Sequence, residues 1–196
     1  MPVLFYKICL WAMSRLERLC VFFPCFGRFY HRLFYEPVIK KEIALARLRP
    51  GERVLHIGGG SYPFTALQLA TYGCEVCLID NNDKAVAAAR EVVARNHLLD
   101  RVQVLFGDGQ EVNGSNFDAV WISLLVQPKK KIVARLLNTL AQEKQLRIVY
   151  RNPRGIFKYF YPALNPHSIA PQYDRRSVLQ LAKKESVVIA REGVRP

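Results

Sequence analysis

The sequence predicts an α/β domain with a mostly parallel sheet covered by helices on both faces, preceded by a helical N-terminal segment. From residue 51 onward, apolar runs of strand length alternate with helical patterns. The first of these strands runs into Gly58, Gly59 and Gly60, which let the backbone turn sharply into a helix. Since 51% of the 196 residues are apolar, we expect one core, with residues 1–50 as the helical segment and 51–196 as the sheet domain.

The N-terminal segment is expected to form two helices. Residues 3–23 place apolar side chains at helical spacing, Pro24 ends that helix, and a second helix runs from about residue 28 to residue 47. No run is long enough to span a bilayer, and no cleavable leader is recognisable. We expect this segment to cap the ligand site of the sheet domain. Peripheral contact of its cationic amphipathic face with a membrane is the alternative.

The sheet domain is expected to consist of five alternating strand and helix units and a shorter end. A strand within 51–57 precedes the glycine turn, and a helix begins at Phe64. Further strands are expected at 75–79, 102–106, 117–123 and 146–150, with helices at 84–96 and 130–140. After residue 166 we predict one helix, 174–184, and one strand, 187–190, which leaves that sheet edge without a final hairpin.

Three polar features follow strands where an α/β sheet holds a nucleotide-like ligand. The glycine turn opens a helix whose free N–H groups attract an anionic group. Asp80 ends the second strand, where its carboxylate can accept hydrogen bonds from both ribose hydroxyls of an adenosine. Asp108 follows the third strand and can meet the exocyclic amine of adenine. The sequence therefore predicts a site for an adenosine-containing ligand.

The net charge of +13 is spread unevenly along the chain. Basic and acidic residues number 9 and 3 in residues 1–50, 5 and 9 in 51–126, and 15 and 4 in 127–196. Such clusters suit RNA, anionic lipid or an anionic small substrate. Nucleic-acid binding is disfavoured because no aromatic-rich RNA signature surrounds the lysines at 129–131. The five cysteines have neither disulfide nor metal-site spacing, which indicates reduced thiols, a cytoplasmic protein and no metal centre.

The strand, the glycine turn, the acidic second strand and the Gly107-Asp-Gly109 strand end resemble class I S-adenosylmethionine-dependent transferases. The resemblance implies a Rossmann-like class I methyltransferase fold with S-adenosylmethionine as the bound donor. His56 stands where that family usually has an acidic residue, and we expect it to face a neighbouring helix without a ligand role. The turn Gly60-Ser-Tyr-Pro-Phe-Thr65 resembles more narrowly that of nicotianamine synthases. Its Pro63 also argues against a dinucleotide.

Two distant segments extend the resemblance to nicotianamine synthases. Residues 151–166 share an arginine, a glycine four residues on, and a Tyr-Pro followed by a second proline. Residues 23–36 share a Phe-Pro-aromatic segment that ends in a glutamate, and Leu124-Leu-Val126 followed by Lys130 resembles the fourth strand and next helix. The resemblance covers about residues 22 to 166. It implies transfer of a 3-amino-3-carboxypropyl group from S-adenosylmethionine to an amine, leaving methylthioadenosine and giving a metal-chelating or opine-like product.

The resemblance also implies roles for individual residues. Glu36 is the expected base, and an ordinary helix glutamate paired with Arg32 or Lys40 is the alternative. Tyr62 is the second catalytic candidate, although its ring could simply pack over the adenosine. The residues expected to hold the donor are Gly58, Gly60, Ser61, Pro63, Thr65, Asp80, Asn81, Asp108, Gly109 and Ser123. Those expected to hold the small amine or amino-acid acceptor are Tyr30, His31, Tyr35, Arg151, Arg154 and Tyr161.

Two other functions stay open at this stage. The same fold and ligand can transfer a methyl group to a small or membrane-associated substrate, which yields S-adenosylhomocysteine instead. A non-catalytic module that binds the cofactor and docks RNA or membrane through its basic ends is the other. The acceptor and the oligomeric state are left open, because the shape of the pocket depends on how the first 50 residues fold over the sheet.

Overall fold

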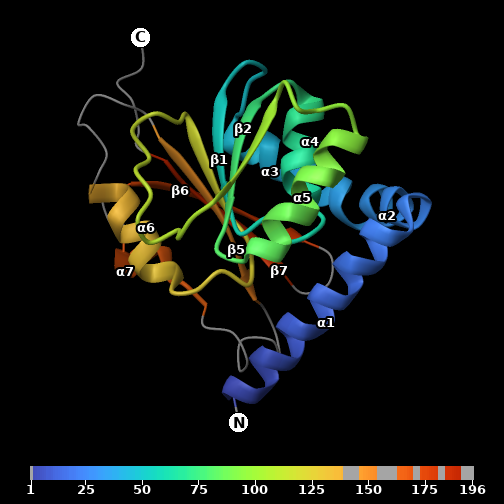
Figure 1. The fold of residues 1–196 in the computed structure, drawn as a ribbon. Helices are drawn as coiled ribbons and strands as arrows, with labels where there is room; N and C mark the ends of the chain where they lie inside the picture. The colour runs from blue at the N-terminus through green and yellow to red at the C-terminus, as the bar shows by residue number, and fades with distance from the viewer. Residues whose placement is uncertain (1, 139–145, 154–162, 170–172, 181–183, 191–196) are drawn as a thin grey trace.

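The structure is a computed structural model of the 196-residue chain, and it describes residues 2–138, 146–153, 163–169, 173–180 and 184–190 (Figure 1). The elements before the sheet are α1 (Pro2–Phe22), α2 (Pro24–Tyr30), the π-helical turn η1 (His31–Tyr35) and α3 (Glu36–Ala46). The next elements are β1 (Arg53–Ile57), α4 (Phe64–Tyr72), β2 (Glu75–Asp80), α5 (Asp83–Arg95), β3 (Val102–Phe106) and β4 (Ala119–Ile122). The last are α6 (Lys129–Asn138), β5 (Arg147–Pro153), α7 (Pro166–Ile169), β6 (Asp174–Gln180) and β7 (Lys184–Ala190).

These strands form a single sheet in the order β3-β2-β1-β4-β5-β7-β6. The strands β1 to β5 pair in parallel, whereas β7 is antiparallel to β5 and β6 is antiparallel to β7. One face packs on α3, α4 and α5, and the other packs on α6 (Figure 1). Alternate residues of β1 serve the two faces: Val54 packs in the first core cluster, while Leu55 and Ile57 pack in the second. The predicted fold class and its five parallel strands are confirmed.

The end of the chain differs from the prediction. Residues 174–180 were predicted as the beginning of a helix, but they form the strand β6. With β7 this strand makes an antiparallel hairpin, which the sequence prediction did not include. Arg, Leu and Gln in this stretch are good helix formers. Pairing with β7 overrides that preference, because a strand buried as deeply as Val187, Val188 and Ile189 needs hydrogen-bond partners on both sides.

The N-terminal helices match the prediction in outline. Pro24 occupies the first turn of α2, where its missing N–H costs nothing, and so separates α1 from α2. The second predicted helix is interrupted by η1, and a π-turn rotates the side chains that follow it around the helix axis. Arg47 closes α3 in a left-handed conformation (φ 49°). No helix among the described residues is long and apolar enough to cross a membrane.

Candidate functional site

A cavity of about 720 Å³ lies where the carboxyl ends of the parallel strands meet the inner side of α1. The strand order reverses between β1 and β4, and open α/β sheets bind ligands at this switch point. The loops after the strands contribute Gly58, Gly59, Gly60, Ser61, Asp80, Asp108 and Ser123 to its wall. The α1 helix contributes Leu10, Trp11, Met13, Ser14 and Glu17. The cavity is therefore formed jointly by the sheet domain and the first helix.

The glycine turn forms the floor of the cavity. Gly58 and Gly60 have φ values of +80° and +67°, which disfavour any side chain, and a Cβ on Gly58 would collide with Val126. The N–H of Gly60 donates to Asp80 Oδ2 at 2.9 Å, and Asp80 Oδ1 accepts the Asn82 N–H at 3.0 Å. The carboxylate of Asp80 therefore connects the turn to the beginning of α5 and is held in place before any ligand binds.

The carboxylate of Glu17, a residue of α1, contacts this turn. Its Oε2 accepts the N–H of Ser61 at 2.7 Å, and its carboxyl group lies against Gly60, where a Cβ would collide with it. Burial raises the pKa of Glu17 to about 7; the Ser61 hydrogen bond opposes this rise and the nearby Asp80 adds to it. A carboxyl group that titrates near neutrality at the wall of a cavity is suited to accept a proton.

The charges around the cavity are predominantly negative. Glu17, Asp80 and Asp108 line it, and Asp108 accepts hydrogen bonds from the Gln110 backbone N–H at 2.8 Å and side-chain amide at 3.1 Å. His56, also on the wall, shares a 3.0 Å hydrogen bond between its Nε2 and Ser123 Oγ. Burial lowers the pKa of His56 to about 3, so its imidazole is neutral. In a chain of net charge +13, this pocket therefore favours a cationic ligand.

Arg151 also lines the cavity, but its positive charge is compensated by the buried carboxylate of Glu42. Its Nε and Nη2 donate to the two carboxylate oxygens of Glu42, each at 2.7 Å, and both residues are buried. Glu42 further accepts hydrogen bonds from Trp121 Nε1 at 3.1 Å and Ser186 Oγ at 2.6 Å. Arg151 Nη2 also donates to Thr65 Oγ1 at 3.2 Å. This hydrogen-bonded ion pair joins α3 to β4, β5, β7 and the first turn of α4 next to the site.

Aromatic side chains gather around Phe64 at the start of α4. Its ring lies 4.3 Å from that of Tyr35, 4.4 Å from Tyr62, 5.6 Å from Tyr30 and 5.8 Å from His31, measured between centroids. Two of these neighbours, Tyr35 and Tyr62, line the cavity together with Phe64. Tyr62 is only 4% exposed. The cluster thus fixes α2 and η1 against the glycine turn.

The structure brings most of the predicted site residues together. All the residues expected to hold the donor line the cavity except Pro63, and Tyr35, Tyr62 and Arg151 line it as well. Tyr30 and His31 do not line it and pack on the outer side of the aromatic cluster. Arg154 and Tyr161 lie outside the described residues.

Glu36 is not brought to the cavity. Its Oε1 pairs with Lys40 Nζ at 2.7 Å along one side of α3, and these hydrogen bonds and charges lower its pKa. The structure thus matches the alternative interpretation of Glu36 as a surface helix glutamate.

Sequence reasoning missed Glu17 and the exposure of His56 to the cavity. Glu17 is the one acidic residue on the inner side of α1, at helical spacing from Leu10, Met13 and Ser14. An acid on the apolar side of an amphipathic helix is the signal that could have identified it. His56 was expected to face a helix, and it does lie on the side of β1 whose Val54 packs with α3, α4 and α5. It borders the cavity as well, as Ile57 does, because both residues lie at the carboxyl end of the strand.

The fold defines the class of the protein. The chain is similar to a SAM-dependent methyltransferase structure from Aquifex aeolicus at 18% identity, with a TM-score of 0.60 and 82% of this chain and 92% of that chain covered. The fold is thus that of S-adenosylmethionine-dependent methyltransferases. Residues 16–195 match the family model described as nicotianamine synthase protein, and the chain belongs to that family.

Solved structures of MtNAS agree with this membership. The crystal structure of MtNAS in complex with MTA and tNA matches 97% of this chain and 74% of that chain, at 26% identity and a TM-score of 0.78. Among curated proteins, L-histidine 2-aminobutanoyltransferase of Yersinia pestis is 31% identical over 115 residues. That alignment covers 58% of this chain and 43% of the relative. The chain therefore spans less than half the length of this relative.

Proposed function

We propose that this chain is a cytoplasmic S-adenosylmethionine-dependent transferase that moves a 3-amino-3-carboxypropyl group to the amine of an amino acid or related small molecule. The observation that carries the proposal is the acidic cavity of a basic protein. Glu17, Asp80 and Asp108 line it, while Arg151 is compensated by Glu42 and His56 is neutral. S-Adenosylmethionine carries a sulfonium cation, and the acceptor of this reaction is an amine, so negative charge favours both.

The residues present fit the donor. Asp80, held by Gly60 and Asn82, has the position at the end of β2 from which a carboxylate accepts ribose hydroxyls. Asp108 lies after β3, where its carboxylate can contact the adenine of the donor. The glycine turn allows the backbone to approach the donor closely. The donor supplies an electrophilic carbon next to its sulfonium. The protein's own contribution is to orient two reactants and to exclude water from the cavity.

Glu17 is the base in this proposal, in place of Glu36. The acceptor nitrogen forms a bond to the Cγ carbon of the methionine moiety, and the C–S bond breaks with its electron pair going to sulfur, which gives methylthioadenosine. The nitrogen must also lose a proton. Glu17 supports this role because its carboxyl group is at the cavity wall and its pKa of about 7 lets it accept that proton near neutral pH.

The relatives suggest which acceptors to test first. L-Histidine 2-aminobutanoyltransferases of Yersinia pestis and Pseudomonas aeruginosa are named for L-histidine, so an amino acid is the substrate class we propose. Tyr35 and Tyr62 border the cavity and supply an aromatic wall suited to a planar side chain such as imidazole. Arg151 stays a proposed contact for an acceptor carboxylate, although Nε and Nη2 are engaged by Glu42.

The coproduct of the reaction tests the proposal directly. The purified chain, incubated with S-adenosylmethionine and L-histidine or a mixture of amino acids and polyamines, is expected to release methylthioadenosine. Mass spectrometry distinguishes this nucleoside from S-adenosylhomocysteine. A reaction without acceptor is the control, because spontaneous decay of the donor also yields methylthioadenosine. Acceptor-independent release alone would contradict the proposal.

Methyl transfer is the second candidate function. A Protein-L-isoaspartate O-methyltransferase of Methylorubrum populi is 34% identical over 118 residues, covering 60% of this chain and 54% of that protein. The same experiment decides between the two reactions, because methyl transfer releases S-adenosylhomocysteine. Binding of the donor with neither coproduct would favour a non-catalytic module.

Asp80→Asn is expected to weaken donor binding by about 10- to 100-fold, because a charged hydrogen-bond acceptor for the ribose is lost. Isothermal titration calorimetry with S-adenosylmethionine measures the affinity. Asp83→Asn is the matched control: it changes the charge equally at an exposed position on the first turn of α5 that does not line the cavity. Equal losses in the two variants would contradict a specific role for Asp80.

A further inference from the structure

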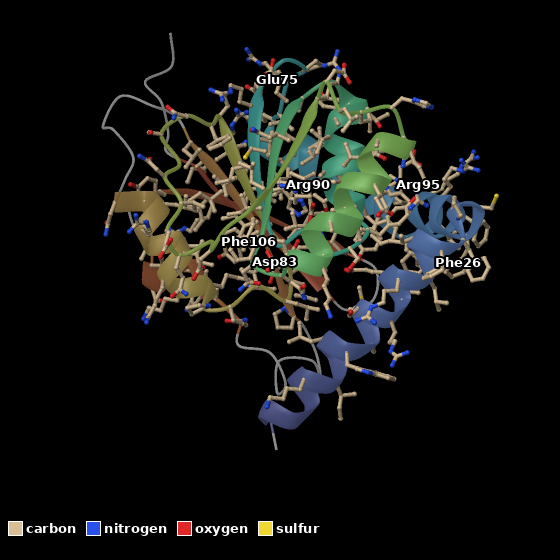
Figure 2. The ribbon with its side chains drawn as sticks, in the orientation of Figure 1. Phe26, Glu75, Asp83, Arg90, Arg95 and Phe106 are labelled. Carbon is tan, nitrogen blue, oxygen red and sulfur yellow. The ribbon has the colours of Figure 1, made fainter. Side chains whose placement is uncertain are left out.

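The outward side of the N-terminal helices exposes large apolar side chains to solvent. Most of the exposed large apolar residues that the structure describes lie before residue 35. Phe22 is 81% exposed, Phe29 64% and Trp11 61%. Phe26 projects from α2 at the edge of the molecule, away from the sheet (Figure 2). Apolar side chains gathered in this way mark a surface that contacts something other than water.

The spacing along α1 places most of this surface away from the cavity. Ile8, Trp11, Leu19 and Phe22 are three, eight and three residues apart, which puts them on one side of the helix, and all four are exposed. Leu10, Met13 and Glu17 lie at other positions around the helix and line the cavity, which Trp11 also borders. One side of α1 is therefore used by the site, and the other is largely an exposed apolar stripe. Further exposed rings follow at Phe23, which precedes α2, and at Phe29 within α2.

The exposed charges on the same segment are basic. Between residues 7 and 34 the basic residues are Lys7, Arg15, Arg18, Arg28 and Arg32, all exposed. The one acidic residue in this stretch is Glu17, whose carboxylate contacts Ser61 in the cavity. None of the five basic side chains forms an ion pair with a carboxylate among the described residues.

We propose that the outer surface of α1 and α2, which includes the exposed rings of Phe22 and Phe29, docks onto an anionic lipid bilayer. A helix with aromatic and aliphatic residues on one side and arginines beside them lies in the interface of a membrane, with its rings among the acyl chains and its cations at the headgroups. Since α1 is also a wall of the cavity, docking brings the cavity close to the membrane surface. The inference is independent of the transfer chemistry.

Charge decides between a bilayer and a second copy of this chain. Two copies pairing through the same surface would bring ten unpaired cations together, five from each copy, with no acidic side chain among residues 7–34 left to balance them. An anionic bilayer supplies the opposite charge along the whole surface.

Tryptophan fluorescence tests the proposal in the full chain. The protein has two tryptophans: Trp11 is exposed in the docking surface and also borders the cavity, so the experiment is done without donor, and Trp121 is 2% exposed in the core. Vesicles of phosphatidylcholine mixed with phosphatidylglycerol are expected to shift the emission of Trp11 to shorter wavelength and to carry the protein upward in a flotation gradient. Vesicles of phosphatidylcholine alone are expected to do neither, and added salt is expected to reverse binding.

Paired variants separate the apolar and the charged contributions. Phe22→Ser with Phe29→Ser is expected to weaken partitioning at least about tenfold, whereas Leu99→Ser with Leu179→Ser, at positions 67% and 60% exposed elsewhere, leaves it unchanged. Arg18→Gln with Arg28→Gln is expected to weaken it about 30-fold. The control variant, Lys130→Gln with Lys131→Gln, removes the same amount of charge from exposed positions on α6 and is expected to leave partitioning unchanged.

Three results would overturn the proposal. Equal binding to neutral and anionic vesicles would remove the charge argument. A blue shift of Trp11 that grows with protein concentration and needs no vesicles would identify a second copy as the partner. Binding to RNA without binding to either vesicle would assign the basic surface to nucleic acid.

Discussion

Glu17→Gln is expected to lower the rate of methylthioadenosine formation by about 100- to 10,000-fold, the usual effect of removing a general base. The substitution keeps the size of the side chain and an oxygen that can accept the Ser61 N–H, so the cavity is expected to keep its shape. Rates measured over a range of donor concentrations, with saturating acceptor, give both kcat and the KM of the donor and so separate the two roles of this carboxylate, proton acceptance and charge compensation. A fall in kcat indicates proton transfer, whereas a rise in the KM of the donor at constant kcat would indicate charge compensation alone.

The pH dependence gives a second readout for Glu17. Its base form accumulates as pH rises through about 7, so kcat/KM is expected to rise to about that pH, and this limb is expected to vanish in Glu17→Gln. Asp80 faces the carboxylate from β2, and Tyr35 and Cys20 lie within its electrostatic reach. A limb that persists in the variant belongs to another group, such as the acceptor amine.

As pH rises toward 7, the stability of the protein is expected to fall while its activity rises. The folded pKa of Glu17, about 7, lies above the ordinary value of 4.5, so the folded state holds the proton more tightly than the unfolded state. Stability therefore falls as pH rises from 4.5 to 7, and above pH 7 the buried charge costs its full amount. Glu17→Gln removes this cost. The variant is expected to melt at a higher temperature than the parent protein at pH 8 and at a similar temperature at pH 4.

The Glu36→Gln variant, measured beside Glu17→Gln, tests which of the two glutamates is the catalytic base. The resemblance of residues 23–36 to nicotianamine synthases favours Glu36, and the geometry favours Glu17, since Glu36 pairs with Lys40 away from the cavity wall. If Glu36→Gln loses the activity and Glu17→Gln keeps it, the segment around η1 must rearrange when substrates bind.

Hydrophobic periodicity and the residues of the turns were sufficient to predict the parallel part of the sheet from the sequence. The glycine turn at 58–60 and acidic residues at the ends of β2 and β3 are local signals, and parallel topology necessarily brings strand ends to one edge. Asp80 and Asp108 could therefore be expected at this edge without knowledge of any contact, and both line the cavity, while their contacts with the donor stay a prediction.

The remaining features depend on contacts between distant residues. Whether residues 174–180 form a strand depends on pairing with β7, and the local preference of Arg, Leu and Gln for helix gives the opposite answer. The same holds for Glu17, whose role depends on how α1 lies over the turn, 44 residues further along the chain. Arg151 was placed at the edge of the site, but its partner Glu42, 109 residues away, could not be read from the sequence.

The Glu42–Arg151 pair is expected to be the most important polar contact for folding. Glu42→Gln leaves the buried guanidinium of Arg151 without its counter-charge, which is expected to cost about 3–5 kcal/mol and to lower the thermal midpoint by roughly 6 to 20 °C. Differential scanning calorimetry measures both. Glu36→Gln is the control, since its exposed pair with Lys40 is worth at most about 0.5 kcal/mol.

The pH dependence of stability distinguishes a charged pair from an ordinary hydrogen bond. Burial alone would raise the pKa of Glu42, but the charge and hydrogen bonds of Arg151 lower it overall. A lowered folded pKa contributes stability above the ordinary value of 4.5 that is lost as pH falls through the folded pKa, so Glu42→Gln is expected to lose this acid sensitivity. Replacing both partners, Glu42→Leu with Arg151→Met, is expected to cost less than Glu42→Gln alone, because no buried charge is left unpaired. A double variant less stable than Glu42→Gln would contradict this account, and would mean that the contacts of Glu42 with Trp121 and Ser186 hold α3 on the sheet.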